Sequence, residues 1–292
     1  LAKNMLRKET SSVILPGEPE KLSKHMKQRR KEGIRINLNH LGEAILGEEE
    51  AKHRLQIYLE DLANPEVEYI SVKISTICSQ INMLGWEDTL NILVNRLKRL
   101  YRAAKENKYI LPNGKSVSKF VNLDMEEYRD LHLTVELFRR VLDDAEFFDF
   151  SAGIVLQSYL PDSYMIQQEL TLWAMRRVAA GGAPIKIRIV KGANLAMEQV
   201  EASLRGWEQA PYSLKSDVDA NFKRMVLFGC EPEHAHAAHL GIGSHNLFDI
   251  AFTMLVRSEN KVEPYICFEM LEGMADHIRR VVQALSGDML LY

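Results

Sequence analysis

The 292-residue sequence has few cysteines, no long apolar run and no strong excess of charge. The three cysteines, Cys78, Cys230 and Cys267, show no CxxC spacing, which argues against a disulfide framework or a zinc site and favours reduced thiols in a cytoplasmic compartment. No apolar stretch approaches the roughly 18 residues of a membrane span. The formal net charge of −3 gives no reason to expect nucleic acid as a partner.

The chain divides into two regions by composition. Residues 1–32 are polar and include the basic run KHMKQRRKEG at 24–33, which predicts a solvated helical arm. The first residues lack the apolar core of a signal peptide. From residue 33 to residue 292, short β-branched runs alternate with helical stretches, and this predicts one large domain.

Eight short runs in the second region have the composition of buried strands. They cover residues 34–39, 69–75, 120–124, 153–159, 185–190, 240–245, 264–270 and 288–292. Between them, WEDTLNILVNRLKRLYRAAKEN and MEEYRDLHLTVELFRRVL place apolar residues on one helical face. Strands that alternate with helices predict parallel pairing through right-handed crossovers.

Eight such units over roughly 250 residues indicate an α/β fold of the (β/α)8 barrel type. The alternative is an open doubly wound sheet, which more often has a glycine-rich first turn, and NHLGEA has no such signature. Because the sequence stops at the eighth strand, we expect a distorted barrel that lacks its final helix in this chain.

In a (β/α)8 barrel the chemistry lies at the carboxyl ends of the strands. Almost every predicted strand ends on a polar side chain. These residues are Asn37, Asn39 and His40, Lys73, Asp124, Gln157, Arg188 and Lys191, His245 and Asn246, Glu269, and Tyr292. These residues would lie together at one end of the barrel, which we call the barrel mouth. Amide, basic and imidazole groups at the mouth suit the binding of a polar ring system and its phosphates better than they suit the catalysis of hydrolysis.

Three familiar patterns are incomplete. LPNGKS at 111–116 lacks the first glycine of a phosphate loop and predicts a Pro-Asn-Gly turn. LGIGSHN lacks the third glycine of a dinucleotide fingerprint. EHAHAAH offers three histidines without a completing carboxylate, so we expect an exposed polar connector and no metal site.

Six motifs in order resemble one enzyme family. RIVKGA at 188–193, SVKIS at 71–75, NLDMEEYRDLHL at 122–133, GIVLQSYL at 153–160, GSHN at 243–246 and CFEMLEGM at 267–274 resemble the strand ends of the proline dehydrogenase family. The resemblance covers most of residues 34–292, and the chain is most similar to the barrel domain of the bifunctional bacterial members.

The resemblance implies a flavoenzyme. FAD would lie across the barrel mouth without covalent attachment, and L-proline would be oxidised to Δ1-pyrroline-5-carboxylate. Electrons would pass to a quinone at the inner membrane, with which a cytoplasmic protein would associate peripherally. An aldehyde dehydrogenase domain would follow the barrel in the full-length chain.

The resemblance also implies roles for individual residues. Lys73, Asp124 and Tyr292 would be catalytic, and the substrate pocket would add Ile189 and Asn194. The cofactor would be bound by Gln157, a donor to the flavin ring, and by Arg188, Val190, Lys191, Gly192, Lys215, Val218, Asp219, His245, Asn246 and Glu269. The charge effect of Lys73 would depend on neutralisation by Asp124.

Two departures from the family pattern affect the substrate pocket. Asn194 stands where bifunctional members often have an aromatic residue, and Val218 stands where the family commonly has threonine. The family binds the proline carboxylate with paired arginines on the last helix, beyond the end of this sequence, so we expect weak proline binding. The alternatives are a folate-reductase-like flavin barrel and a non-catalytic barrel fragment that docks partner domains.

Overall fold

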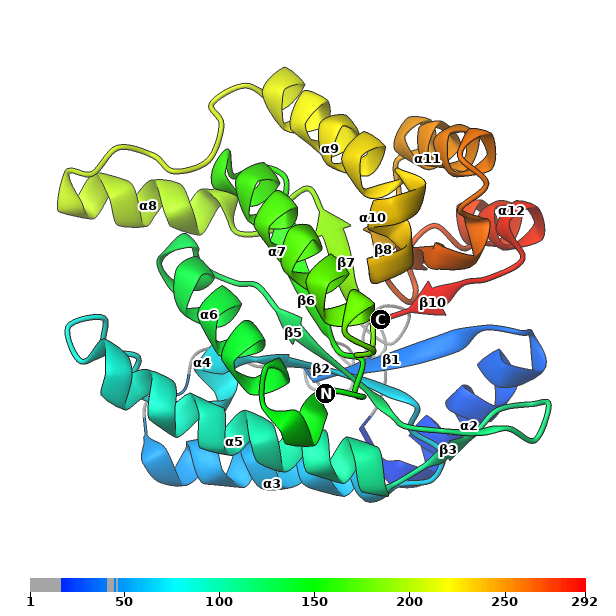
Figure 1. The fold of residues 1–292 in the computed structure, drawn as a ribbon, viewed down its shortest axis with the longest axis horizontal. Helices are drawn as coiled ribbons and strands as arrows, with labels where there is room; N and C mark the ends of the chain where they lie inside the picture. The colour runs from blue at the N-terminus through cyan, green and yellow to red at the C-terminus, as the bar shows by residue number, and fades with distance from the viewer. Residues whose placement is uncertain (1–16, 41–44, 46) are drawn as a thin grey trace, which may run out of the picture.

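The computed structural model describes residues 17–40, 45 and 47–292, and these form a closed barrel of eight parallel strands (Figure 1). The strand order around the barrel is β1-β10-β9-β8-β7-β6-β5-β2. The barrel strands are β1 (Arg35–Asn39), β2 (Tyr69–Lys73), β5 (Phe120–Asp124), β6 (Gly153–Gln157), β7 (Ile185–Val190), β8 (Ala238–Gly243), β9 (Ile266–Met270) and β10 (Leu290–Leu291). The predicted (β/α)8 fold is therefore confirmed.

Strand β7 shows how the sequence specifies two faces. Ile185, Ile187 and Ile189 are fully buried, and the alternating positions carry Lys186 and Arg188. Because successive side chains of a strand point to opposite faces, the two basic residues share one face. That face is the barrel interior, where both side chains contact a carboxylate from β9.

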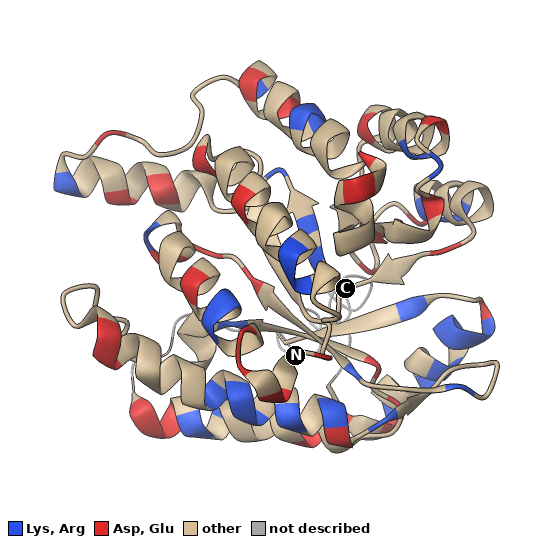
Figure 2. Cartoon of the chain, in the orientation of Figure 1, with Lys and Arg blue, Asp and Glu red and all other residues tan. Residues whose placement is uncertain are grey.

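Helices cover the outside of the barrel. The longer ones are α3 (Glu48–Ala63), α5 (Trp86–Glu106), α6 (Leu131–Leu142), α7 (Asp162–Ala179), α9 (Lys215–Gly229), α11 (Leu247–Glu259) and α12 (Asp276–Ser286). Helix α8 (Leu195–Arg205) extends away from the barrel strands (Figure 1), and Ala202 is its buried residue. The predicted apolar face of α5 is confirmed, since Leu90, Leu93 and Leu97 are fully buried, and charges of both signs lie along the outer helices (Figure 2). Among the described residues, no helix combines the length and apolar character needed to cross a bilayer.

Helix α2 (Pro19–Lys31) corrects the expectation of a solvated arm. The helix forms, but it packs on the outside of the barrel between α12 and the α3–β2 connection. Met26 is buried, Arg30 donates to the Glu66 carbonyl, and Gln283 of α12 donates to the Glu32 carbonyl. Residues 1–16 of the predicted arm lie outside the described residues.

Several boundaries differ from the predictions. The strand expected at 69–75 ends at Lys73, because Ile74–Ile77 form the short helix α4. The strand expected at 240–245 is β8, which begins earlier, and the exposed connector expected before it is helix α10 (Pro232–Ala237), in which Ala235 and Ala237 are buried. The Pro-Asn-Gly turn is confirmed, and it joins a small hairpin of β3 (Tyr109–Ile110) and β4 (Ser116–Val117).

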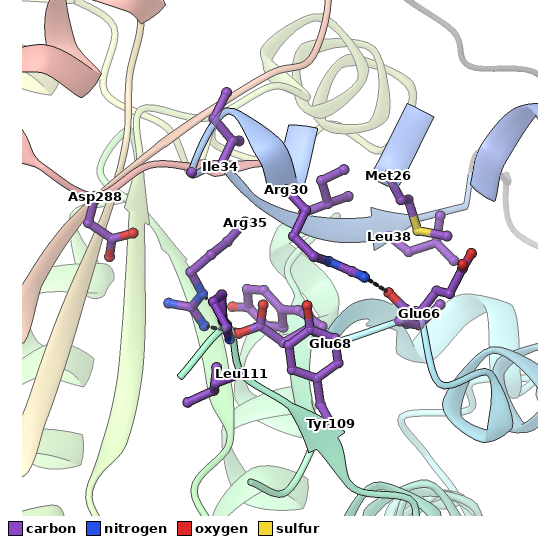
Figure 3. A pocket seen from close by; sticks show the side chains of 15 residues that line it. Met26, Arg30, Ile34, Arg35, Leu38, Glu66, Glu68, Tyr109, Leu111 and Asp288 are labelled. Carbon is purple, nitrogen blue, oxygen red and sulfur yellow. Dashed lines mark hydrogen bonds and ion pairs between the residues drawn. The ribbon is translucent and has the colours of Figure 1, made fainter. Parts of the chain in front are cut away.

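A pocket of about 190 Å³ lies at the amino-terminal ends of the strands, beside α2 and the hairpin (Figure 3). Arg35 is paired with Glu68, and the Arg30 guanidinium lies 5.3 Å from the centre of the Tyr109 ring. Because chemistry in this fold belongs to the opposite end of the barrel, these contacts serve to attach α2 and the hairpin to the barrel.

Candidate functional site

The carboxyl ends of the strands bring Arg188 of β7 to the centre of a buried charge network. Its Nη1 lies 2.9 Å from the Asp124 carboxylate of β5, and its Nε lies 2.5 Å from the Glu269 carboxylate of β9. The side chain of Arg188 is 2% exposed. Two carboxylates from different strands thus each accept one hydrogen bond from the guanidinium, and together they fix its position and its plane.

Glu269 lies beneath Arg188 and is completely buried. Its second oxygen lies 2.5 Å from Lys186 Nζ. Burial alone would raise the pKa of Glu269, but the charges of Arg188 and Lys186 outweigh burial and lower it. The predicted direct contact between Glu269 and a cofactor is therefore revised, because its carboxylate is enclosed by these two cations.

Asp124 accepts hydrogen bonds from two further strands, β1 and β2, and from its own strand β5. The donors are Asn39 Nδ2 at 3.0 Å, the Ser71 hydroxyl at 3.1 Å and Asn122 Nδ2 at 2.8 Å. These bonds hold the Asp124 carboxylate in place against Arg188, so the geometry suits Asp124 to orient the guanidinium. A catalytic role of Asp124 stays a prediction.

Lys73 contacts a carboxylate that the sequence did not identify as part of the site. Its Nζ lies 2.8 Å from Glu126 Oε1, and Ser75 donates to the other oxygen of Glu126. The effect of Lys73 was predicted to depend on whether Asp124 neutralises it, and in the structure Lys73 pairs with Glu126 while Asp124 pairs with Arg188.

The backbone carbonyl of Glu126 joins two further predicted residues. Gln157 Nε2 donates to it at 3.1 Å and Asn194 Nδ2 at 2.8 Å. One of the two Nε2 N–H groups of Gln157 is thereby used, and its Oε1 has no partner among the described residues. The predicted donor role of Gln157 toward a flavin ring stays a prediction.

A second cluster of charges follows β7. Lys191 Nζ lies 2.5 Å from Asp219 and 2.7 Å from Asp249, and Lys215 pairs with the other oxygen of Asp219. Burial lowers the pKa of Lys191, but its bonds to the two carboxylates outweigh this and raise it. The structure therefore brings together three predicted residues, Lys191, Lys215 and Asp219, and adds Asp249. Val218 lies half-buried on the same helix.

Gly192 adopts a backbone conformation that side chains rarely allow. Its φ is 130°, and a Cβ placed there would lie 2.6 Å from the Tyr159 ring. The backbone after Val190 therefore turns closely over that ring. Ile189 is fully buried, so its contact with a substrate stays a prediction.

His245 accepts a hydrogen bond at Nε2 from the Leu271 backbone N–H at 3.0 Å. In the neutral ring the proton then resides on Nδ1, which has no partner among the described residues. Burial lowers the pKa of His245 and so favours this neutral form. Asn246 caps α11 by accepting from the Phe248 and Asp249 backbone N–H groups.

Tyr292 completes the mouth next to Arg188. The Arg188 guanidinium carbon lies 4.6 Å from the centre of the Tyr292 ring. Burial raises the pKa of Tyr292 to about 12, so the phenol is protonated at neutral pH.

Three of the buried polar atoms that lack partners among the described residues lie on, or just after, the consecutive strands β6, β7 and β8. They are Gln157 Oε1 on β6, Arg188 Nη2 on β7 and His245 Nδ1 just after β8. Buried polar groups are normally satisfied, so unpaired ones on three consecutive strands mark where a polar ligand would bind. The set offers acceptor, cationic donor and neutral donor, which fits a flavin ring. Within the described residues, no group of three His, Cys, Asp or Glu side chains could hold a metal ion.

Glu126, Asp249 and Lys186 were missed at the sequence level. Glu126 resembles an ordinary acidic residue at a helix entry, and Asp249 lies in the first turn of α11. The position of Lys186 could have been recognised from the sequence. A lysine in the interior of a buried strand requires a carboxylate partner, which indicates a buried ion pair.

Comparison with known proteins agrees with this geometry. Residues 22–292 match the sequence model of the family described as Proline dehydrogenase. The structure of Proline Utilization A (PutA) from Corynebacterium freiburgense superposes with a TM-score of 0.91 at 44% identity, covering 99% of this chain and 29% of that one. PutA from Bdellovibrio bacteriovorus, inactivated by N-propargylglycine, gives 0.89 at 29% identity, covering 100% of this chain and 31% of that one.

A curated relative is also similar. "Proline dehydrogenase 2" of Bacillus subtilis (strain 168) is 22% identical over 269 residues, which is 91% of this chain and 75% of the relative. The chain spans less than a third of the length of the two solved structures.

Proposed function

The chain belongs to the proline dehydrogenase family, and on that premise we propose that it oxidises L-proline to Δ1-pyrroline-5-carboxylate with FAD as its cofactor. The observation that carries the proposal is the Arg188 network. It places a fixed cation at the mouth beside two unpaired polar atoms, Gln157 Oε1 and His245 Nδ1.

The residues present fit the cofactor. Arg188, Gln157 and His245 would hold the flavin ring, and Lys191 with its carboxylates would lie toward the phosphates or the ribityl chain. When bound, FAD would accept a hydride equivalent from the carbon next to the proline nitrogen. The guanidinium of Arg188 is already oriented for negative charge that develops on the ring, so no reorganisation is needed.

The substrate end of the mouth would be formed by Lys73, Tyr292 and Asn194. The ammonium of Lys73 would attract the proline carboxylate, and its pairing with Glu126 tempers that attraction. The Tyr292 ring lies over Arg188 and would bound the pocket on that side. Asp124 would act through Arg188.

The remaining parts of the proposal concern the whole protein. We propose that electrons pass to a quinone at the membrane, and that an aldehyde dehydrogenase domain follows in the full-length chain. The support for the second domain is the similarity to PutA chains more than three times as long. The cytoplasmic location with peripheral membrane association remains part of this proposal.

The decisive experiment is the visible spectrum of the purified full-length protein before and after anaerobic addition of L-proline. We expect a flavin band that bleaches with proline. A flavin band that resists proline but bleaches with NADH would overturn the substrate and favour a folate-reductase-like barrel. A protein that takes up no flavin from added FAD would favour the non-catalytic scaffold.

A further inference from the structure

We propose that Glu269 and Lys186 are positioning residues, which act on the reaction only by holding the guanidinium of Arg188 at the barrel mouth. This inference rests on the proposed function. It assigns a role to a buried ion pair whose carboxylate contacts Arg188 directly. The pair consists of Lys186 on β7 and Glu269 on β9, with Nζ and Oε1 2.5 Å apart.

The four charged groups form a single chain of alternating sign through the barrel. Lys186 contacts Glu269, Glu269 contacts Arg188, and Arg188 contacts Asp124. Their side-chain exposures are 11%, 0%, 2% and 12% in that order. Burying a charge is costly unless it is paired, so removing one inner member leaves an uncompensated charge.

Each end of the Arg188 guanidinium has a distinct anchor. Glu269 accepts a hydrogen bond from Nε and Asp124 accepts one from Nη1. The centre of the Tyr292 ring lies 4.6 Å from the guanidinium carbon. The remaining nitrogen, Nη2, has no partner among the described residues. With two anchors and a stacked ring, the plane cannot rotate, so the direction of Nη2 is set by the protein.

Gly241 on β8 provides independent evidence that the fold makes room for this pair. A Cβ at Gly241 would lie 2.0 Å from Glu269 Oε1 and 2.9 Å from Lys186 Cε. No other residue type lets the carboxylate occupy its position between the two cations. Gly241 also lies directly beside Arg188 in the parallel register of β7 and β8.

Lys186 has a specific task in this arrangement. Glu269 Oε2 binds Arg188, so Oε1 needs a cation of its own to keep the carboxylate from turning. The ammonium is enclosed on its other side by the Tyr69 ring, whose centre is 5.3 Å away. Lys186 therefore fixes Glu269, and Glu269 fixes Arg188.

The test uses three variants of the full-length protein: Glu269→Gln, Lys186→Met, and the double variant. Glu269→Gln removes one negative charge and turns an amide N–H₂ toward one of the two cations. The double variant removes one charge of each sign, leaving the neutral Arg188–Asp124 pair. The exposed Glu87→Gln, which alters the surface pair with Arg140, is the matched control.

Two measurements distinguish a positioning role from a purely structural one. The first measures, for each variant, both the single-turnover rate of flavin reduction by proline and the resistance of the protein to urea. We expect Glu269→Gln to lower the rate at least tenfold. In the double variant, resistance to urea should return toward the parent, while the rate stays at least tenfold low because a neutral amide oxygen replaces the charged anchor of Nε. A double variant with both the urea resistance and the flavin-reduction rate of the parent would overturn the proposal. An unchanged rate in Glu269→Gln would also overturn it.

The second readout needs no flavin. The ¹⁵N-detected Nε–Hε group of Arg188 should exchange slowly with solvent in the flavin-free parent, and at least tenfold faster in the double variant. Equal exchange in the two proteins would overturn the positioning role. If the parent is not reduced by proline, the proposed function fails, and this exchange measurement still decides whether Glu269 and Lys186 hold Arg188. If Glu269→Gln does not fold, the double variant carries both readouts.

Discussion

Asp124 on β5 lies 2.9 Å from Arg188 on β7, so one ion pair spans the intervening strand β6 near the carboxyl ends of the barrel. Arg188 is 2% exposed and Asp124 12%, which makes this a buried pair. Because Asp124 also accepts hydrogen bonds from Asn39, Ser71 and Asn122, it links residues of β1, β2 and β5 to the guanidinium on β7.

Asp124→Asn should therefore destabilise the protein and impair the site together. Removing one partner of a buried ion pair leaves an uncompensated charge, and we expect the free energy of unfolding to fall by about 3 kcal/mol. Urea denaturation followed by circular dichroism measures this. Asp88→Asn, an exposed change in the first turn of α5, should cost less than about 1 kcal/mol. Equal losses in the two variants would contradict the network described for Asp124.

Gly192→Ala should be far more damaging than Gly206→Ala, although both glycines have positive φ. At Gly206 the φ of 65° is left-handed and a Cβ would meet no atom within 4 Å, so alanine should cost about 1 kcal/mol. At Gly192 the φ is 130° and a Cβ would press into the Tyr159 ring. We expect about 3 kcal/mol of lost stability from strain and clash together, measured by thermal unfolding. Similar melting temperatures for the two variants would contradict the close approach.

The sequence predicted the barrel well where strand and helix signals were unambiguous. The strands at 120–124 and 185–190 were placed without error, since each contains β-branched residues and is bounded by turn or helix residues. The strand at 69–75 was predicted too long because Ile74 continues the apolar run although it begins a helix. Composition alone cannot separate a buried strand from a buried helical turn.

The site residues were predicted as a set, but their pairing was not. Arg188 and Glu269 are 81 residues apart in sequence, and only the closed barrel brings them together. The sequence left open whether Asp124 neutralises Lys73, and the structure shows an ion pair between Lys73 and Glu126, two residues beyond Asp124. Sequence periodicity places a side chain on a face but does not choose among neighbouring carboxylates, because that choice depends on the register between strands.

Glu272 should make stability depend on acid pH. His25 and Arg29 of α2 both contact its carboxylate. Burial raises the pKa of Glu272, but its bonds to His25 and Arg29 outweigh burial and lower the pKa to about 2. A lowered folded-state pKa gives stability that is present above the unfolded value of about 4 and is lost as pH falls from there toward about 2.

The measurement is the free energy of unfolding as a function of pH for the parent and Glu272→Gln. At neutral pH we expect the variant to be about 2 kcal/mol less stable, and the difference should shrink between about pH 4 and pH 2. Glu20→Gln, at the start of the same helix, is the control. A difference between parent and Glu272→Gln that does not change with pH would show that the carboxylate charge does not hold α2 in place.

Lys191 and Lys215 offer a matched pair, since both contact the carboxylate of Asp219. Lys191 is 25% exposed and also contacts the buried Asp249, whereas Lys215 is 77% exposed and contacts Asp219 alone. Lys191→Met should therefore leave two carboxylates without their shared cation, and we expect FAD affinity to fall at least tenfold, about 1.4 kcal/mol. Lys215→Met removes an exposed i,i+4 pair and should change the affinity less than threefold.

Titration of the flavin-free protein with FAD, monitored by the quenching of flavin fluorescence, gives the FAD dissociation constants of both variants. Equal losses would mean that the cofactor meets the exposed end of this cluster rather than the buried one.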